Sequence, residues 1–284
     1  MRFCRARSLD EALELLGEWG EDGCLLAGGT DVMAQYKRGE IAPGAFIHVD
    51  KIEPLSSISM NGRTAIGALT THCTLASDAD IALRQPAVAD AARLVGGWQT
   101  QAVGTVGGNI CNASPAADLA PPLLVADAHV TLASKSGERR VPLDAFFMGR
   151  HATARRPDEL LSIIDLEPLP PRSAETYVKL GRRGAMDVAI VGLAVRLGLR
   201  DDGTIGTARV AVCSVAATPR RVPEAEAVLV GGRLDEGALA SAGQALVAAA
   251  SPIDDARGTA SYRRRVLPGM LEQAALYCSK EISR

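Results

Sequence analysis

Two glycine-rich turns, far apart in the chain, constrain its fold more than any other feature. The first, Gly28-Gly29-Thr30-Asp31, follows the apolar run Cys24–Ala27, and the second is Gly104-Thr105-Val106-Gly107-Gly108. Glycine tolerates positive φ and leaves backbone N–H groups open to a ligand. A strand, a glycine turn and a helix capped by Thr30 or Asp31 would direct such groups at an anion. Two such turns predict a dinucleotide held between two lobes rather than on one βαβ unit.

The second turn continues into a polar run that suits the same kind of ligand. Asn109, Ser114 and Asp118 can hydrogen-bond a sugar or a diphosphate, and the run is too polar for a core strand. Neither G-x-G-x-x-G after a strand nor G-x-x-x-x-G-K-[ST] occurs, so the standard nucleotide signatures are missing. A tight turn without a ligand is the alternative for an isolated glycine pair.

Charge and hydropathy exclude several classes of partner. The chain has 284 residues, a formal net charge of −2 and 47% hydrophobic residues, which is ordinary for a globular protein and gives no basic field for nucleic acid. No apolar run reaches the roughly 18 residues that span a bilayer, and the first residues lack the apolar core of a signal peptide. We therefore expect a cytoplasmic chain without a transmembrane segment.

The cysteines and histidines do not have the spacing of metal ligands. The six cysteines form no C-x-x-C pair and the four histidines no H-x-x-x-H pair. Reduced, mostly buried thiols are the expected state. We therefore predict no metal site in this chain, and any redox metals of the system would lie on other chains.

Periodicity predicts an α+β chain. A capping box at Ser8 and Glu11 begins a helix over 9–18. The strands are expected at 24–27, 45–49, 64–67, 129–133, 139–141, 160–166, 176–180, 188–199 and 205–215. The other helices are expected at 31–37, 87–95, 223–230, 235–250 and 259–281. The proline-rich segment 168–171 is the predicted domain boundary. It ends a first domain over 1–171, with lobes of about 1–55 and 56–171, and a sheet-plus-helices module follows over 172–284.

Six segments, in order, resemble one family. They are LLAGGTDV at 25–32, TVGGNICNASPAADLAPPLLVADA at 105–128, DAFFMGRHAT at 144–153, PDELLSIIDL at 157–166, YVKLGRRGAMDVAIV at 177–191 and AATPRRVPEAEAVL at 216–229. This pattern is similar to the flavin-binding medium subunit of the molybdenum hydroxylases, the group of xanthine and carbon monoxide dehydrogenases. The resemblance implies a two-lobed FAD-binding domain of the vanillyl-alcohol-oxidase/PCMH type, followed by a C-terminal antiparallel sheet with helices.

The resemblance also implies a set of FAD-binding residues. Around the diphosphate it places Leu26, Ala27, Gly28, Gly29, Thr30 and Asp31 from the first turn and Gly104, Thr105, Val106, Gly107, Gly108 and Asn109 from the second. Cys111, Ser114 and Asp118 match positions on the ribose and adenine side. Leu161 matches a residue that packs on the isoalloxazine, although plain strand core is about as good an interpretation. Lys179 matches a lysine near the flavin, with a solvent-facing lysine as the alternative.

Some residues depart from the family pattern, and two arginines are expected outside the FAD site. Gln101-Ala102 stands where many relatives have Arg-Asn, and Val95 replaces an aromatic residue, so the position of the flavin edge is less defined than that of its diphosphate. Arg155 and Arg156 are expected on a solvated or subunit-facing surface.

The implied function is electron transfer. A large molybdopterin subunit would oxidise the substrate, and a small subunit with two [2Fe-2S] clusters would pass the electrons to non-covalent FAD on this chain. The complex is expected to be a dimer of heterotrimers. No catalytic residue is predicted here. The alternative is a self-sufficient FAD-dependent oxidoreductase with its own substrate pocket. The sequence decides neither the substrate nor the final acceptor, which could be NAD⁺, a quinone, a redox protein or oxygen.

Overall fold

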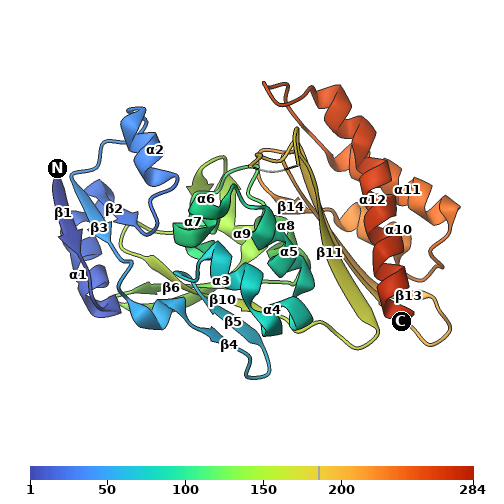
Figure 1. Cartoon of the computed structure of the whole chain (residues 1–284), viewed down its shortest axis with the longest axis horizontal. Helices are drawn as coiled ribbons and strands as arrows, with labels where there is room; N and C mark the ends of the chain where they lie inside the picture. The colour runs from blue at the N-terminus through green and yellow to red at the C-terminus, as the bar shows by residue number, and fades with distance from the viewer. Residues whose placement is uncertain (185) are drawn as a thin grey trace.

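The chain forms a mixed helix and sheet structure that extends along one axis (Figure 1). The computed structural model describes residues 1–184 and 186–284. Sheets of three, five and four strands follow one another from the N-terminal to the C-terminal end of the molecule. The three sheets therefore lie in chain order.

The N-terminal lobe is a small parallel sheet with one long helix against it. Its strands, in spatial order, are β1 (Arg2–Arg5), β3 (Ala45–His48) and β2 (Gly23–Leu26), and its helices are α1 (Leu9–Trp19) and α2 (Val32–Lys37). The predicted cap is confirmed, because the Ser8 hydroxyl accepts from the Glu11 N–H at 3.1 Å. Periodicity did not predict β1, whose side chains are mostly exposed and include two arginines.

The middle of the chain is an antiparallel sheet with short helices packed against it. The strands run in the order β4 (Ile58–Ser59), β5 (Thr64–Gly67), β10 (Leu160–Leu166), β6 (His129–Ser134) and β7 (Gly137–Pro142). The helices are α3 (His72–Ser77), α4 (Ala79–Arg84), α5 (Pro86–Leu94), α6 (Trp98–Val103), α7 (Val106–Cys111), α8 (Ala120–Val125) and α9 (Leu143–Phe146). A hairpin of β8 (Phe147–Gly149) and β9 (Ala152–Thr153) follows α9.

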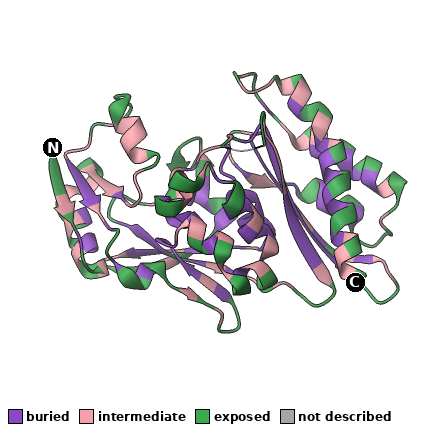
Figure 2. Ribbon diagram, viewed as in Figure 1, coloured by how far each residue is buried: buried purple, intermediate pink, exposed green. Residues whose placement is uncertain are grey.

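The C-terminal module is an antiparallel sheet buried on both faces. Its order is β11 (Ser173–Leu180), β12 (Val191–Leu199), β13 (Ile205–Cys213) and β14 (Arg220–Arg221). One face carries α10 (Pro223–Leu229), α11 (Glu236–Ala249) and α12 (Ala260–Ile282), which confirms the predicted helices (Figure 1). The other face packs on α5 and α8, so the strands are buried along most of their length (Figure 2). β12 begins three residues later than expected, where its partner strand β11 ends.

A buried hydrogen bond and two partly buried ion pairs join the C-terminal sheet to the middle of the chain. Arg196 on β12 donates to Glu175 on β11 and to Gln85, which precedes α5. Asp127 after α8 accepts from Arg209 and Arg221. The segment between β10 and β11 contains the predicted boundary, and the domain limits stay a prediction.

Candidate functional site

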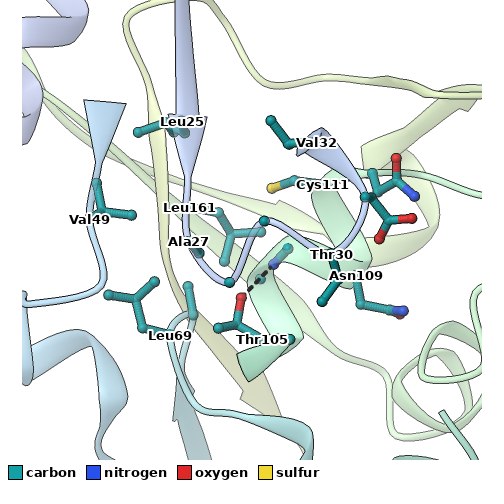
Figure 3. A pocket seen from close by; sticks show the side chains of 18 of the residues that line it. Leu25, Ala27, Thr30, Val32, Val49, Leu69, Thr105, Asn109, Cys111 and Leu161 are labelled. Carbon is teal, nitrogen blue, oxygen red and sulfur yellow. Dashed lines mark hydrogen bonds between the residues drawn. The ribbon is translucent and has the colours of Figure 1, made fainter. Parts of the chain in front are cut away.

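A cleft of about 520 Å³ lies where the N-terminal lobe meets the middle of the chain. The turn after β2 and helix α7 both line it (Figure 3). An apolar wall is built from strand ends and loops, and it consists of Leu25, Val49, Leu55, Leu69, Leu160 and Leu161. The two glycine turns, 76 positions apart from Gly28 to Gly104, therefore border one cavity.

The glycines are required because backbones touch at this point. A Cβ on Gly28 would lie 1.8 Å from the carbonyl oxygen of Val103, and one on Gly107 would lie 2.7 Å from the Ala68 oxygen. Positive φ, by contrast, occurs in these turns only at Gly29, with φ +69°. The expectation that the glycines supply positive φ is therefore wrong for the second turn, where close packing is the reason.

The amides of the first turn are free to bind a ligand. In the described part of the chain, the N–H groups of residues 28–32 donate to no protein acceptor. Met33 is the first residue after the turn whose N–H is bonded, to the oxygen of Gly29 at 3.1 Å. Consecutive free amides beside a cleft are a site for an anion such as a phosphate.

The amides of the second turn are already bonded within the protein. Val106 donates to Thr70, Gly107 to Ala68, and Gly108 to the Thr105 hydroxyl, at 3.0, 2.8 and 3.1 Å. Thr105 is thereby the side-chain cap of α7 (Figure 3). Asp31 stands at the N-cap position of α2, but its carboxylate makes no capping hydrogen bond. The two turns thus differ, and a direct role of Val106–Gly108 in binding the diphosphate stays a prediction.

The cleft is completed by the polar side chains of Gln35, His72, Asn112 and His151, which the predicted set did not contain, and by that of the predicted Asn109. Gln35 Nε2 donates to the Asn112 side-chain oxygen Oδ1 at 2.9 Å, and the His151 ring Nδ1 lies 2.8 Å from the Asn112 backbone carbonyl oxygen. His72 is 3% exposed, and its burial lowers its pKa to about 4, so the ring is neutral. The Asn109 Oδ1 atom is buried without a partner among the described residues. Gln35 and Asn112 follow the two turns closely in the sequence, whereas only tertiary contacts bring His72 and His151 to the cleft.

The two cleft thiols are held in their protonated form. Burial raises the pKa of Cys111 to about 11 and also raises that of Cys24, while Arg155 lowers both. Arg155 itself lines the cleft, so its predicted place on an outer surface is wrong.

Most of the predicted cofactor-binding residues border the cleft. They are Ala27, Gly28, Gly29, Thr30, Asp31, Gly104, Thr105, Gly107, Gly108, Asn109, Cys111 and Leu161. The remaining predicted residues do not line it, and they are Leu26, Val106, Ser114, Asp118 and Lys179. Whether each of these residues contacts FAD stays a prediction.

Asp118 and Lys179 are partners of each other in the interior. Asp118 Oδ2 accepts from Lys179 Nζ at 2.8 Å, and Oδ1 accepts from the Tyr177 hydroxyl at 2.7 Å. Lys179 also donates to the carbonyl of Leu94 at 2.8 Å. Burial raises the pKa of Asp118, while the charge and hydrogen bond of Lys179 and the hydrogen bond of Tyr177 lower it. These contacts join the loop before α8 and the end of α5 to β11.

No helix among the described residues is long and apolar enough to cross a membrane. Within the same residues, no group of three or more His, Cys, Asp or Glu side chains could hold a metal ion.

Comparison with known proteins identifies the class of this fold and cleft. Residues 1–168 match the FAD binding domain in molybdopterin dehydrogenase, and residues 175–277 match the CO dehydrogenase flavoprotein C-terminal domain. The fold and site are thus those of a flavoprotein.

Individual relatives agree over almost the whole chain. The carbon monoxide dehydrogenase medium chain of Hydrogenophaga pseudoflava is 32% identical over 94% of this chain and 93% of its own length. The putative xanthine dehydrogenase FAD-binding subunit of Escherichia coli is 30% identical over 95% and 93%. A solved structure of carbon monoxide dehydrogenase from Hydrogenophaga pseudoflava matches with a TM-score of 0.94 and 31% identity, covering 99% of this chain and 98% of that chain. The chain belongs to the family of FAD-binding medium subunits of the molybdenum hydroxylases.

Proposed function

We propose that this chain binds FAD non-covalently in the cleft and acts as the electron-transfer subunit of a molybdenum-containing hydroxylase. The observation that carries the proposal is the row of free amides at residues 28–32 beside the contact of the two glycine turns. A dianionic diphosphate fits those amides, and the apolar wall suits the flat rings of a flavin.

The residues of the chain bind and shield the cofactor. Leu161 and its apolar neighbours would exclude water from one side, and Asn109 offers an acceptor that has no protein partner. Bound FAD supplies redox chemistry that accepts electrons singly and releases them in pairs.

Two of the titratable side chains that line the cleft, His72 and Cys111, are not poised for acid–base or nucleophilic chemistry at neutral pH. His72 is neutral because its pKa is about 4, and the pKa of Cys111, about 11, keeps that thiol protonated. This arrangement favours electron relay over conversion of a substrate on this chain.

The partners follow from the family. We propose a large molybdopterin subunit and a small subunit with two [2Fe-2S] clusters, assembled as a dimer of heterotrimers. A PCMH-type fold for residues 1–171, with a separate C-terminal domain over 172–284, belongs to the same proposal. A cytoplasmic location agrees with the six free thiols.

Rapid mixing tests the division of labour. The purified chain should be yellow, and acid precipitation should release its flavin. Substrate should bleach the flavin only when the molybdenum and iron–sulfur subunits are present. Bleaching of this chain by substrate alone would refute electron relay in favour of a self-sufficient oxidoreductase, and a chain that takes up no flavin would refute the cofactor itself.

A further inference from the structure

Arg155 is fixed in a wall of the cleft by the backbone of its own loop. Its Nη1 atom donates to the carbonyls of Arg156, Pro157 and Glu159, at 2.9, 3.4 and 2.7 Å. These bonds use one of the three guanidinium nitrogens, so the side chain is positioned in advance while donors remain for a ligand.

The positive charge of Arg155 has no counter-ion in the protein. Glu159, the buried carboxylate of the same loop, is bonded to Arg139 through both oxygens, at 2.5 and 2.8 Å, and also accepts from the Arg156 N–H at 2.7 Å. Among the residues that the structure describes, Arg155 forms no ion pair with a carboxylate. An arginine on the wall of a cleft with an unmatched charge is an anion-binding group.

The charge acts on the interior of the cleft. Arg155 lowers the pKa of Cys24 on the strand wall and of Cys111 on the helix wall, against the larger effect of burial. Both thiols line the cavity, and they belong to different elements, so the charge acts on two of its walls. Asp31 lines the same cavity, where burial raises its pKa and the charges of His151 and Arg38 lower it, and a second anion placed there needs a further cation.

We propose that Arg155 supplies the positive charge that neutralises the diphosphate of FAD, together with the free amides of residues 28–32. This role rests on the proposed function. Amide dipoles provide only partial charges, whereas a guanidinium provides a full one and can donate two parallel hydrogen bonds to phosphate oxygens. The diphosphate is therefore held between the turn after β2 and the loop after β9.

The test uses the flavin-free full-length chain and three ligands that separate phosphate from base. Arg155→Met removes the charge and keeps most of the apolar stem, and Arg155→Lys keeps the charge. Arg156→Met is the matched control, because Arg156 is the exposed neighbour outside the cleft wall. FAD, ADP and adenosine are titrated by calorimetry against each chain at low and high salt.

Arg155→Met should weaken FAD and ADP by roughly ten- to hundredfold, the effect of losing a charged hydrogen bond, and should leave adenosine unchanged. Arg155→Lys should retain part of the affinity, and the control should bind as the wild type does. Added salt should weaken ADP binding more in the wild type than in Arg155→Met.

Equal FAD affinity in the wild type and Arg155→Met would overturn the role of Arg155 while leaving the proposed function intact. An equal loss for adenosine and ADP would show that Arg155 contacts the base, which also overturns it. If Arg155→Met does not fold, ADP binding is measured at low and high salt in the wild type and Arg155→Lys, and salt-independent binding refutes the proposal. A wild-type chain that binds no FAD refutes the proposed function instead.

Discussion

Replacing Lys179 by methionine tests the buried contact between the C-terminal sheet and the loop before α8. The side chains of Lys179 and Asp118 are 6% and 7% exposed, and their charged atoms are 2.8 Å apart. Methionine has a similar length and no charge, so the substitution leaves the Asp118 carboxylate buried with only the Tyr177 hydroxyl as a partner. The carbonyl of Leu94 loses its side-chain donor as well.

The expected cost is about 3–5 kcal/mol, the range for removing one partner of a buried ion pair. For a chain of this size each kcal/mol lowers Tm by roughly 2–3 °C, so the expected fall is roughly 6–15 °C. The double variant Lys179→Met/Asp118→Asn contains no unpaired buried charge and should recover a large part of this loss.

The pH dependence has a definite sign. Burial already raises the pKa of Asp118, and the variant lacks the lowering by Lys179, so the pKa of the folded state rises further above the unfolded value. Between those two pKa values the unfolded chain releases a proton that the folded chain keeps, so stability falls as pH rises. Denaturation of Lys179→Met at about pH 5 and about pH 8 should show a larger loss at the higher pH, relative to the double variant. A pH-independent loss below about 1 kcal/mol would refute the buried-pair argument.

Three other predictions concern the cleft. Gly28→Ala should abolish FAD uptake, since its Cβ would lie 1.8 Å from the Val103 oxygen, and normal flavin absorbance in this variant would contradict the packing. The control Gly17→Ala in α1 meets open space and should stabilise the chain by roughly 0.5–1 kcal/mol in thermal melts. Thr105→Ala should lower the free energy of unfolding by about 1 kcal/mol through the lost cap of α7, and Thr105→Ser should stay close to wild type in denaturant titrations. Equal stability of all three chains would show that the cap is dispensable. Cys111, with a pKa of about 11, should be thiolate in roughly one molecule in ten thousand at neutral pH. Its alkylation, measured by mass spectrometry, should therefore accelerate steeply toward alkaline pH, and fast labelling at pH 7 would contradict the raised pKa.

Local signals predicted the elements that they govern. The helices α10 to α12 begin and end within one residue of the predicted limits, because their caps and apolar spacing are written in consecutive residues. The Ser8 cap and the strands β5 and β10 were predicted for the same reason. Twelve of the site residues that the family resemblance implied border the cleft, and eight of them belong to the two glycine turns, which are local motifs.

What the sequence did not reveal depends on contacts between distant segments. The requirement for glycine at position 28 comes from the Val103 carbonyl, which no local pattern announces. Arg155 and Arg156 are adjacent and chemically identical, yet only Arg155 faces the cleft, because the loop carbonyls hold its guanidinium there. Asp118 was expected near a sugar, but Tyr177 and Lys179 on β11 occupy its oxygens.

Strand β11 explains why the C-terminal sheet matters to a cleft that it does not line. Alternate residues along one face of β11 contact opposite ends of α5: Glu175 accepts from the Ala87 N–H at its start, and Lys179 donates to the Leu94 carbonyl at its end. An acid at the N-terminus and a base at the C-terminus both favour the helix dipole, so β11 holds α5 in one direction and one register. The next residue, Val95, lines the cleft. A change that shifts β11 therefore moves α5 with it, and the cleft wall at Val95 follows.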